Sequence, residues 1–192
     1  WVGRLIPLKH PEQALRLASK LKRQGYSFRL NIVGDGEMRS FLEQYQYELD
    51  VADKVIFNGS VPADEVRAYM EKASVFLFTS DKREGWGAVL NESMNSGCVV
   101  VANDEIGSVG FLLQDEKNGL IYHNGDEEML LSQVKRLMNS TSLRKQLGYN
   151  AYRTIRDTWS AQNAAVNFMR LTQNLLNGDH GIALVGPGSK IS

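Results

Sequence analysis

Short apolar runs alternate along the chain with longer segments in which apolar residues recur at every third or fourth position. The short runs have the length of buried β-strands, and the periodic segments have the spacing of amphipathic helices. We expect strands at residues 28–33, 55–57, 75–78, 98–102 and 120–122, and the end of one more at Trp1–Gly3. We expect helices at residues 11–24, 37–49, 62–73, 88–96, 107–113, 127–139, 143–157 and 160–176.

Strands and helices that alternate with short connections predict an α/β fold, because parallel neighbouring strands need a crossover between them. The sequence therefore predicts a doubly wound, Rossmann-like parallel sheet of about six strands with helices on both faces. We expect one domain over residues 1–176 and a flexible, glycine-rich tail over residues 177–192. Because the chain opens inside a predicted strand, we expect an excised domain whose upstream residues are missing.

The composition excludes several functional classes. The 192 residues carry 22 basic and 22 acidic side chains, so no overall positive field indicates nucleic acid and no polybasic run indicates a membrane surface. No apolar stretch approaches the length of a membrane span, and no Cys/His/Asp cluster has metal-ligand spacing. The single cysteine, Cys98, has apolar neighbours, so we expect a buried thiol and a reducing compartment.

The stretch from Thr79 to Ala102 carries the strongest chemical signal, since it predicts a strand, a glycine loop, a short helix and a second strand. Gly85 and Gly87 let a ligand approach the backbone, and the helix expected from Ala88 offers unpaired N–H groups and a partial positive charge. Such a loop suits an anion, phosphate above all. Two carboxylates, Glu84 and Glu92, bracket it.

Ligands of doubly wound sheets bind at the carboxyl ends of the strands. Two cations, Arg4 and Lys9, and the turn Gly34-Asp35-Gly36 follow predicted strands at this edge. Arginine clamps phosphate oxygens with two hydrogen bonds and lysine adds a point charge, so the set fits a diphosphate. We expect one cleft lined by Arg4, Lys9, Glu84, Glu92 and the glycine turn, with Glu84 toward its outer end and unpaired amide groups facing it.

Four motifs occur together in a familiar order and spacing: Val2-Gly3-Arg4-Leu5-x-x-x-Lys9, Ile32-Val33-Gly34-Asp35-Gly36, Val55-x-Phe57-x-Gly59 and Glu84-Gly85-Trp86-Gly87-x-x-x-x-Glu92. Over residues 1–176 the chain thereby resembles the C-terminal, donor-binding domain of GT-B glycosyltransferases, in particular retaining family 4, or glycosyltransferase group 1. It departs from the family pattern at His10, where glycine is common, and at residues 106–109, where a double glycine is usual.

The resemblance implies a role for each matching position. Arg4 and Lys9 would hold the donor diphosphate, Glu84 would bind hydroxyls of the donor sugar, and Glu92 would bind the ribose hydroxyls. The implied catalytic residues are Glu84, Arg4 and Lys9, and the implied donor-contacting residues are Gly3, Gly34, Gly36, Gly59, Gly85, Trp86, Gly87, Ala88, Val89, Leu90 and Glu92. No cofactor or metal is implied, since fixed cations and amide groups can stabilise a departing diphosphate.

As a whole, the resemblance implies a retaining hexosyltransferase of polysaccharide or glycoconjugate biosynthesis. The donor would be a UDP-, GDP- or ADP-sugar, and a missing N-terminal domain would hold a carbohydrate or lipid-linked acceptor. We expect the isolated chain to be inactive, and the protein to work in the cytoplasm or at the inner face of a membrane.

Two alternatives remain open. A nicotinamide-dinucleotide domain would share Gly34-x-Gly36, although Arg39 stands at the third glycine position. A non-catalytic nucleotide-binding or scaffold protein would keep the same fold. Trp86 fits both core packing and a stacking surface, and Glu92 also fits a charge that complements a helix start.

Overall fold

A computed structural model describes residues 1–178 and 184–189. Over these residues the chain forms the strands β1 (Leu30–Val33), β2 (Val55–Gly59), β3 (Val75–Phe78), β4 (Val99–Asn103) and β5 (Leu120–Tyr122). The α-helices are α1 (Pro11–Arg23), α2 (Arg39–Glu48), α3 (Ala63–Lys72), α4 (Val89–Asn95), α5 (Val109–Leu112), α6 (Glu127–Asn139), α7 (Thr141–Arg153) and α8 (Ala161–Leu176). Two short elements complete them, a 3-10 helix η1 (Pro7–Lys9) and a π-helix η2 (Thr154–Thr158).

All the strand pairs are parallel, which confirms the predicted α/β fold. β1 pairs with β2, and β4 lies between β3 and β5 in a three-stranded sheet. Within the described residues the strands thus form two sheets rather than one sheet of about six strands. The difference arises at the start of the chain, where Val2 joins β1 by one isolated bridge, to Val33, instead of forming a strand.

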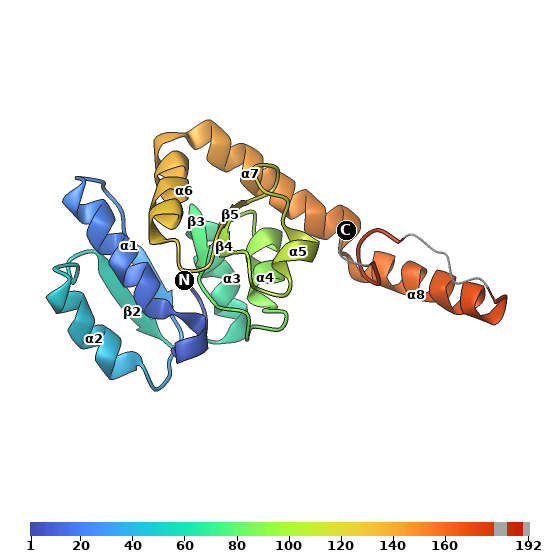
Figure 1. The fold of residues 1–192 in the computed structure, drawn as a ribbon, viewed down its shortest axis with the longest axis horizontal. Coiled ribbons are helices and arrows are strands. Elements are labelled where there is room, and N and C mark those ends of the chain that lie inside the picture. Colours follow the sequence, from blue (N-terminus) through green and yellow to red (C-terminus); the bar gives the residue numbers. More distant parts are fainter. Residues whose placement is uncertain (179–183, 190–192) are drawn as a thin grey trace.

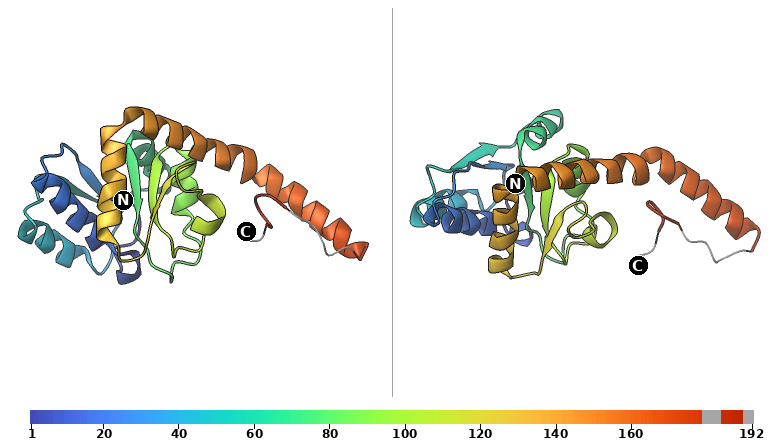
Figure 2. Two further views of the ribbon diagram at one scale, coloured as in Figure 1. Left: turned by 45° about the horizontal axis from the view of Figure 1, so that its top comes forward. Right: turned by 90° about the horizontal axis from the view of Figure 1, so that it is seen from above.

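Successive residues of the central strand face two different apolar cores. Val99 and Val101 of β4 lie in one core with side chains of α1 and α6, and Val100 and Ala102 lie in the other with side chains of α4 and α5. Because side chains alternate along a strand, each face of the sheet needs its own cover of helices. Figures 1 and 2 show helices on both sides of the strands, as expected for a doubly wound fold.

Several element boundaries differ from the predicted ones by a few residues. The short helix expected at residues 107–113 covers only Val109–Leu112, and the N–H of Gly107 before it is bonded to the carbonyl of Glu84. The helix expected at residues 143–157 is α-helical only as far as Arg153 and continues as η2. Cys98 is buried as predicted, and this burial raises the pKa of its thiol to about 12.

The last helix, α8, projects away from the rest of the domain (Figures 1 and 2). The described part of the tail lies against it, since the amide of Asn167 donates hydrogen bonds to the carbonyls of Val185 and Pro187, at 3.0 and 2.8 Å. Residues 179–183 and 190–192 of the tail lie outside the described residues. None of the helices in the described ranges combines the length and the apolar character that crossing a membrane requires.

Candidate functional site

Three loops lie side by side at the carboxyl ends of β1 and β2, and they contain residues 3–5, 34–36 and 59. The N–H of Leu5 donates to the carbonyl of Asp35 at 2.9 Å, and the N–H of Gly34 donates to the carbonyl of Gly59 at 2.7 Å. A Cβ on Gly34 would lie 1.9 Å from the carbonyl oxygen of Gly3, so only glycine permits this approach. The side chain of Arg4 is exposed beside these glycines.

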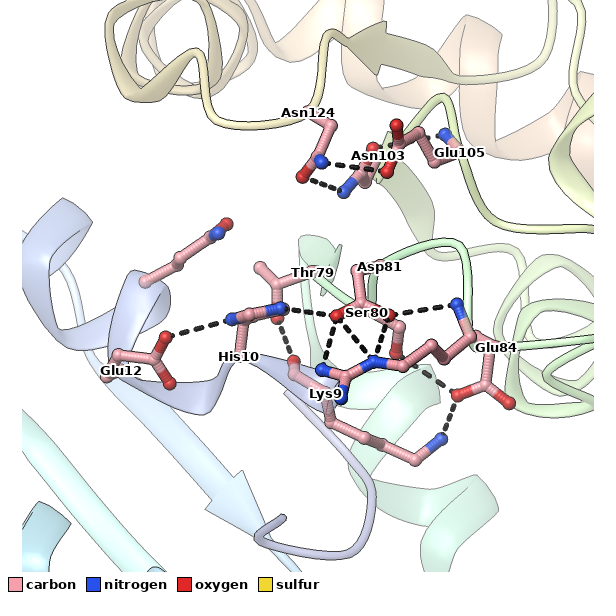
Figure 3. A network of polar contacts seen from close by, with 12 residues as sticks. Lys9, His10, Glu12, Thr79, Ser80, Asp81, Glu84, Asn103, Glu105 and Asn124 are labelled. Carbon is pink, nitrogen blue, oxygen red and sulfur yellow. Dashed lines mark hydrogen bonds and ion pairs between the residues drawn. The ribbon is translucent and has the colours of Figure 1, made fainter. Parts of the chain in front are cut away.

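A second group of predicted residues meets at the carboxyl end of β3. The ammonium of Lys9, which ends η1, forms an ion pair with the carboxylate of Glu84, 75 positions away in the sequence. Both side chains are largely buried, with 16% and 14% of their surface exposed. The hydroxyl of Ser80 donates to the same carboxylate oxygen at 3.2 Å (Figure 3).

Residues at the end of β3 hold the segment around Lys9 through its main chain. The Thr79 hydroxyl donates to the carbonyl of Lys9 at 2.7 Å, and the N–H of Asp81 donates to the carbonyl of Leu8 at 3.0 Å. The indole N–H of Trp1 in turn donates to the Thr79 hydroxyl oxygen at 2.9 Å. The loop that carries Glu84 and the segment that carries Lys9 are therefore attached to each other.

The carboxylate of Asp81 connects several groups in this region. Hydrogen bonds from the Arg83 guanidinium hold the pKa of Asp81 well below its usual range, so this carboxyl group is ionised. The Nε2 atom of His10 lies 2.9 Å from Oδ2 of Asp81 (Figure 3). Within the described residues, the acidic and histidine side chains form no group of three that could hold a metal ion.

The helix start after the glycine loop differs in detail from the prediction. α4 begins at Val89, and the N–H of Leu90 donates to the carbonyl of Gly87 at 2.9 Å. The expectation that the amide groups of this helix start are unpaired is therefore wrong for Leu90, because the chain tightens into a turn there. Glu92 lies on the exposed surface of α4.

The sequence left open whether Trp86 packs in the core or offers an exposed stacking surface, and its ring is partly packed and partly exposed. Its ring packs against Phe111 and Trp159, with ring centroids 5.5 and 5.7 Å away, and its N–H donates to the side chain of Asn91 at 2.9 Å. The residue nevertheless remains 38% exposed. One part of the side chain is thus packed, and another part faces solvent in the loop of residues 84–87.

The predicted residues thus gather around Arg4 and the glycine turns and around Lys9 and Glu84, and the two groups adjoin, since a Cβ on Gly3 would lie 3.1 Å from Cδ of Lys9. Two cavities of about 450 and 650 Å³ are lined by other side chains, between β1 and β3 and beside α5 and α7. The single cleft that would join Arg4, Lys9, Glu84 and Glu92 stays a prediction.

Sequence reasoning missed the contributions of Thr79, Ser80 and Asp81. These three consecutive polar residues follow the apolar run of β3 directly and supply the contacts to Leu8, Lys9, His10 and Glu84. The available signal was their position, since polar residues directly after a buried parallel strand face the edge where ligands bind.

Comparison with known proteins matches the family model "Glycosyl transferases group 1" to residues 1–154. An uncharacterized glycosyltransferase of Methanocaldococcus jannaschii is 28% identical over 179 residues, which is 92% of this chain and 45% of that protein. A GDP-mannose-dependent alpha-(1-6)-phosphatidylinositol monomannoside mannosyltransferase of Mycolicibacterium smegmatis is 28% identical, over 82% of this chain and 43% of its own length. The chain thus spans less than half the length of these curated relatives.

Solved structures share the fold at lower sequence identity. A TarM variant of S. aureus in complex with Fondaparinux, alpha-GlcNAc-glycerol and UDP has a TM-score of 0.80 at 22% identity, over 88% of this chain and 34% of that one. Anabaena HepE in complex with UDP has a TM-score of 0.73 at 21% identity, over 92% of this chain and 48% of that one. Since the family model matches most of the sequence, the chain belongs to the glycosyl transferases group 1 family.

Proposed function

We propose that this chain is the donor-binding part of a retaining glycosyltransferase that transfers a sugar from a nucleoside diphosphate to an acceptor. The observation that carries the proposal is the Lys9–Glu84 pair, a cation and a carboxylate joined at the carboxyl end of β3 and largely shielded from water. The UDP bound in the TarM and HepE structures and the GDP-mannose dependence of the mycolicibacterial relative support a UDP-, GDP- or ADP-sugar donor.

The chemistry of the leaving group explains the two cations. When the bond between the sugar carbon and the phosphate oxygen breaks, the departing nucleoside diphosphate gains negative charge. Lys9 and Arg4 would bind the diphosphate oxygens and stabilise this charge, helped by backbone amide groups of the Gly85–Val89 loop, so that no metal is required. Arg4 is exposed and can reorient toward a ligand.

The ion pair also predicts how the donor enters. Before binding, Glu84 is the charged partner of Lys9. Phosphate oxygens would replace this partner, and the released oxygen of Glu84 would accept hydrogen bonds from hydroxyls of the donor sugar. Glu92 would bind the ribose hydroxyls, and residues near Gly59 would line the base.

The rest of the proposal concerns the intact protein. Because the chain covers less than half of its curated relatives, a further part of the protein would bind the carbohydrate or lipid-linked acceptor. The reaction would take place in the cytoplasm or at the inner face of a membrane. We expect the 192-residue chain to bind the donor nucleotide without transferring the sugar.

Titration of the intact protein with UDP, GDP, ADP and NAD tests the donor site. We expect one nucleoside diphosphate to bind and Lys9→Met to weaken it about tenfold or more, because a hydrogen bond to a charged group contributes about 1.5–3 kcal/mol. Lys20→Met is the matched control, since Lys20 also pairs with carboxylates, those of Glu127 and Glu128, on α1 but outside the proposed site.

Equal weakening by both lysine variants would contradict the assignment of Lys9 to the diphosphate. Preferential binding of NAD would favour the dinucleotide alternative instead. Nucleotide binding without sugar transfer by the intact protein, tested with a panel of donors and acceptors, would favour the non-catalytic scaffold.

A further inference from the structure

His10 has a strained backbone conformation next to Lys9. It stands between the end of η1 and the start of α1, with φ 46° and ψ 49°, in the left-handed region. A side chain with a Cβ is disfavoured there, and glycine is not. Because such a conformation persists only where surrounding contacts hold it, His10 is a candidate for a functional constraint.

Both nitrogens of the His10 ring face carboxylate oxygens. Nε2 lies 2.9 Å from Oδ2 of Asp81, and Nδ1 lies 3.1 Å from Oε1 of Glu12 (Figure 3). The three side chains are 28%, 14% and 17% exposed, so the contacts are partly shielded from water. Among residues 1–178 and 184–189, the other oxygen of Glu12 is buried without a hydrogen-bond donor, which makes the contact with the ring more important for this carboxylate.

The His10–Asp81 contact is a second connection between the segment that carries Lys9 and the loop that carries Glu84. His10 follows Lys9 in the chain, and the N–H of Glu84 donates to the carbonyl of Asp81 at 2.9 Å. The segment with Lys9 and the loop with Glu84 are therefore joined through their charged side chains and again through His10 and Asp81. The second link restrains the backbone from which the Lys9 ammonium extends.

We propose that His10 is a positioning residue of the donor site. Its ring holds Asp81, and this contact fixes the direction from which the Lys9 ammonium meets the diphosphate of the nucleotide. His10 acts through Lys9 and does not itself touch the donor. The inference rests on the proposed function, since it assigns His10 to the same diphosphate.

Three substitutions of His10 separate positioning from backbone strain. His10→Gly removes both the ring and the strain. In His10→Asn the amide nitrogen lies about where Nδ1 lies, so it can reach Glu12 but not Asp81, and asparagine tolerates the left-handed region. In His10→Gln the amide nitrogen lies about where Nε2 lies, so the contact with Asp81 can be kept while the backbone strain remains.

The experiment measures, in the intact protein, the Kd of the nucleoside diphosphate that binds best among UDP, GDP and ADP, together with the melting temperature. We expect His10→Gly and His10→Asn to weaken binding about fivefold or more, and His10→Gln to stay within about twofold of the unmodified protein. Backbone strain predicts a different order for the melting temperatures, with glycine and asparagine above glutamine.

Three results would overturn the inference. If the variants with the higher melting temperatures bind the nucleotide more tightly, or if His10→Gly binds as tightly as the unmodified protein, His10 has only a structural role. The proposed donor site would still stand. If the unmodified protein binds none of the three nucleotides, the proposed function fails and the role of His10 fails with it.

Discussion

Replacing Gly107 by alanine should destabilise the protein and disturb the loop that carries Glu84. The N–H of Gly107 donates to the carbonyl of Glu84 at 3.1 Å, and a Cβ on Gly107 would lie only 1.8 Å from the carbonyl oxygen of Gly85. Real Cβ contacts are not found below 3.0 Å, and the obstacle is backbone rather than a flexible side chain. One loop must therefore move by about 1 Å, and overpacking of this kind costs about 3 kcal/mol.

Gly85→Ala is the matched control, because it adds the same methyl group from the other side of the same contact. A Cβ on Gly85 meets no atom within 4 Å, and its backbone is not in the left-handed region. We expect this variant to stay within about 0.5 kcal/mol of the unmodified protein. Urea unfolding of the intact protein, followed by tryptophan fluorescence, gives both values, since Trp86 lies in the affected loop.

With a urea slope of about 2 kcal/mol/M, the loss expected for Gly107→Ala lowers the unfolding midpoint by about 1.5 M. The same displacement should weaken binding of the nucleoside diphosphate, because the displaced carbonyl belongs to Gly85, the residue directly after Glu84. Equal midpoints for the two alanine variants would refute the reasoning, since the close approach of the two loops would then impose no constraint.

Two further predictions concern titratable groups outside the site. Cys98 should react with a thiol reagent only after unfolding, because burial raises the pKa of its thiol to about 12, and fast modification of the folded protein would contradict this packing. The hydrogen bond that the protonated His123 ring donates to the carboxylate of Asp104 raises the pKa of His123, so the stabilising effect of this bond is complete below the ordinary histidine pKa of about 6.5 and is lost as the pH rises through the higher folded-state value. Thermal unfolding measured from pH 6 to pH 8 should therefore show a small fall in midpoint that His123→Gln removes, and identical pH profiles would contradict the contact.

The sequence by itself determined the local structure and the family. Strands and helices are visible because burial on both faces makes a strand a short apolar run, whereas burial of one face gives a helix a period of 3.6, and neither pattern depends on the rest of the fold. The alternation of the two element types then predicts a parallel sheet, because parallel strands need a crossover. Gly34 is predictable for a similar reason, since a turn that must pass close to another backbone admits no side chain.

Only the tertiary structure decided which candidate residues meet. Lys9 and Glu84 are in contact because η1 and the loop after β3 reach the same point, and no local pattern encodes a contact across 75 positions. The left-handed backbone of His10 and its contact with Asp81 also depend on this meeting of loops. Glu92 belongs to the same sequence motif as Glu84 but lies on the exposed surface of α4, because a motif fixes the spacing along the chain and the packing of the helix fixes which way a side chain faces.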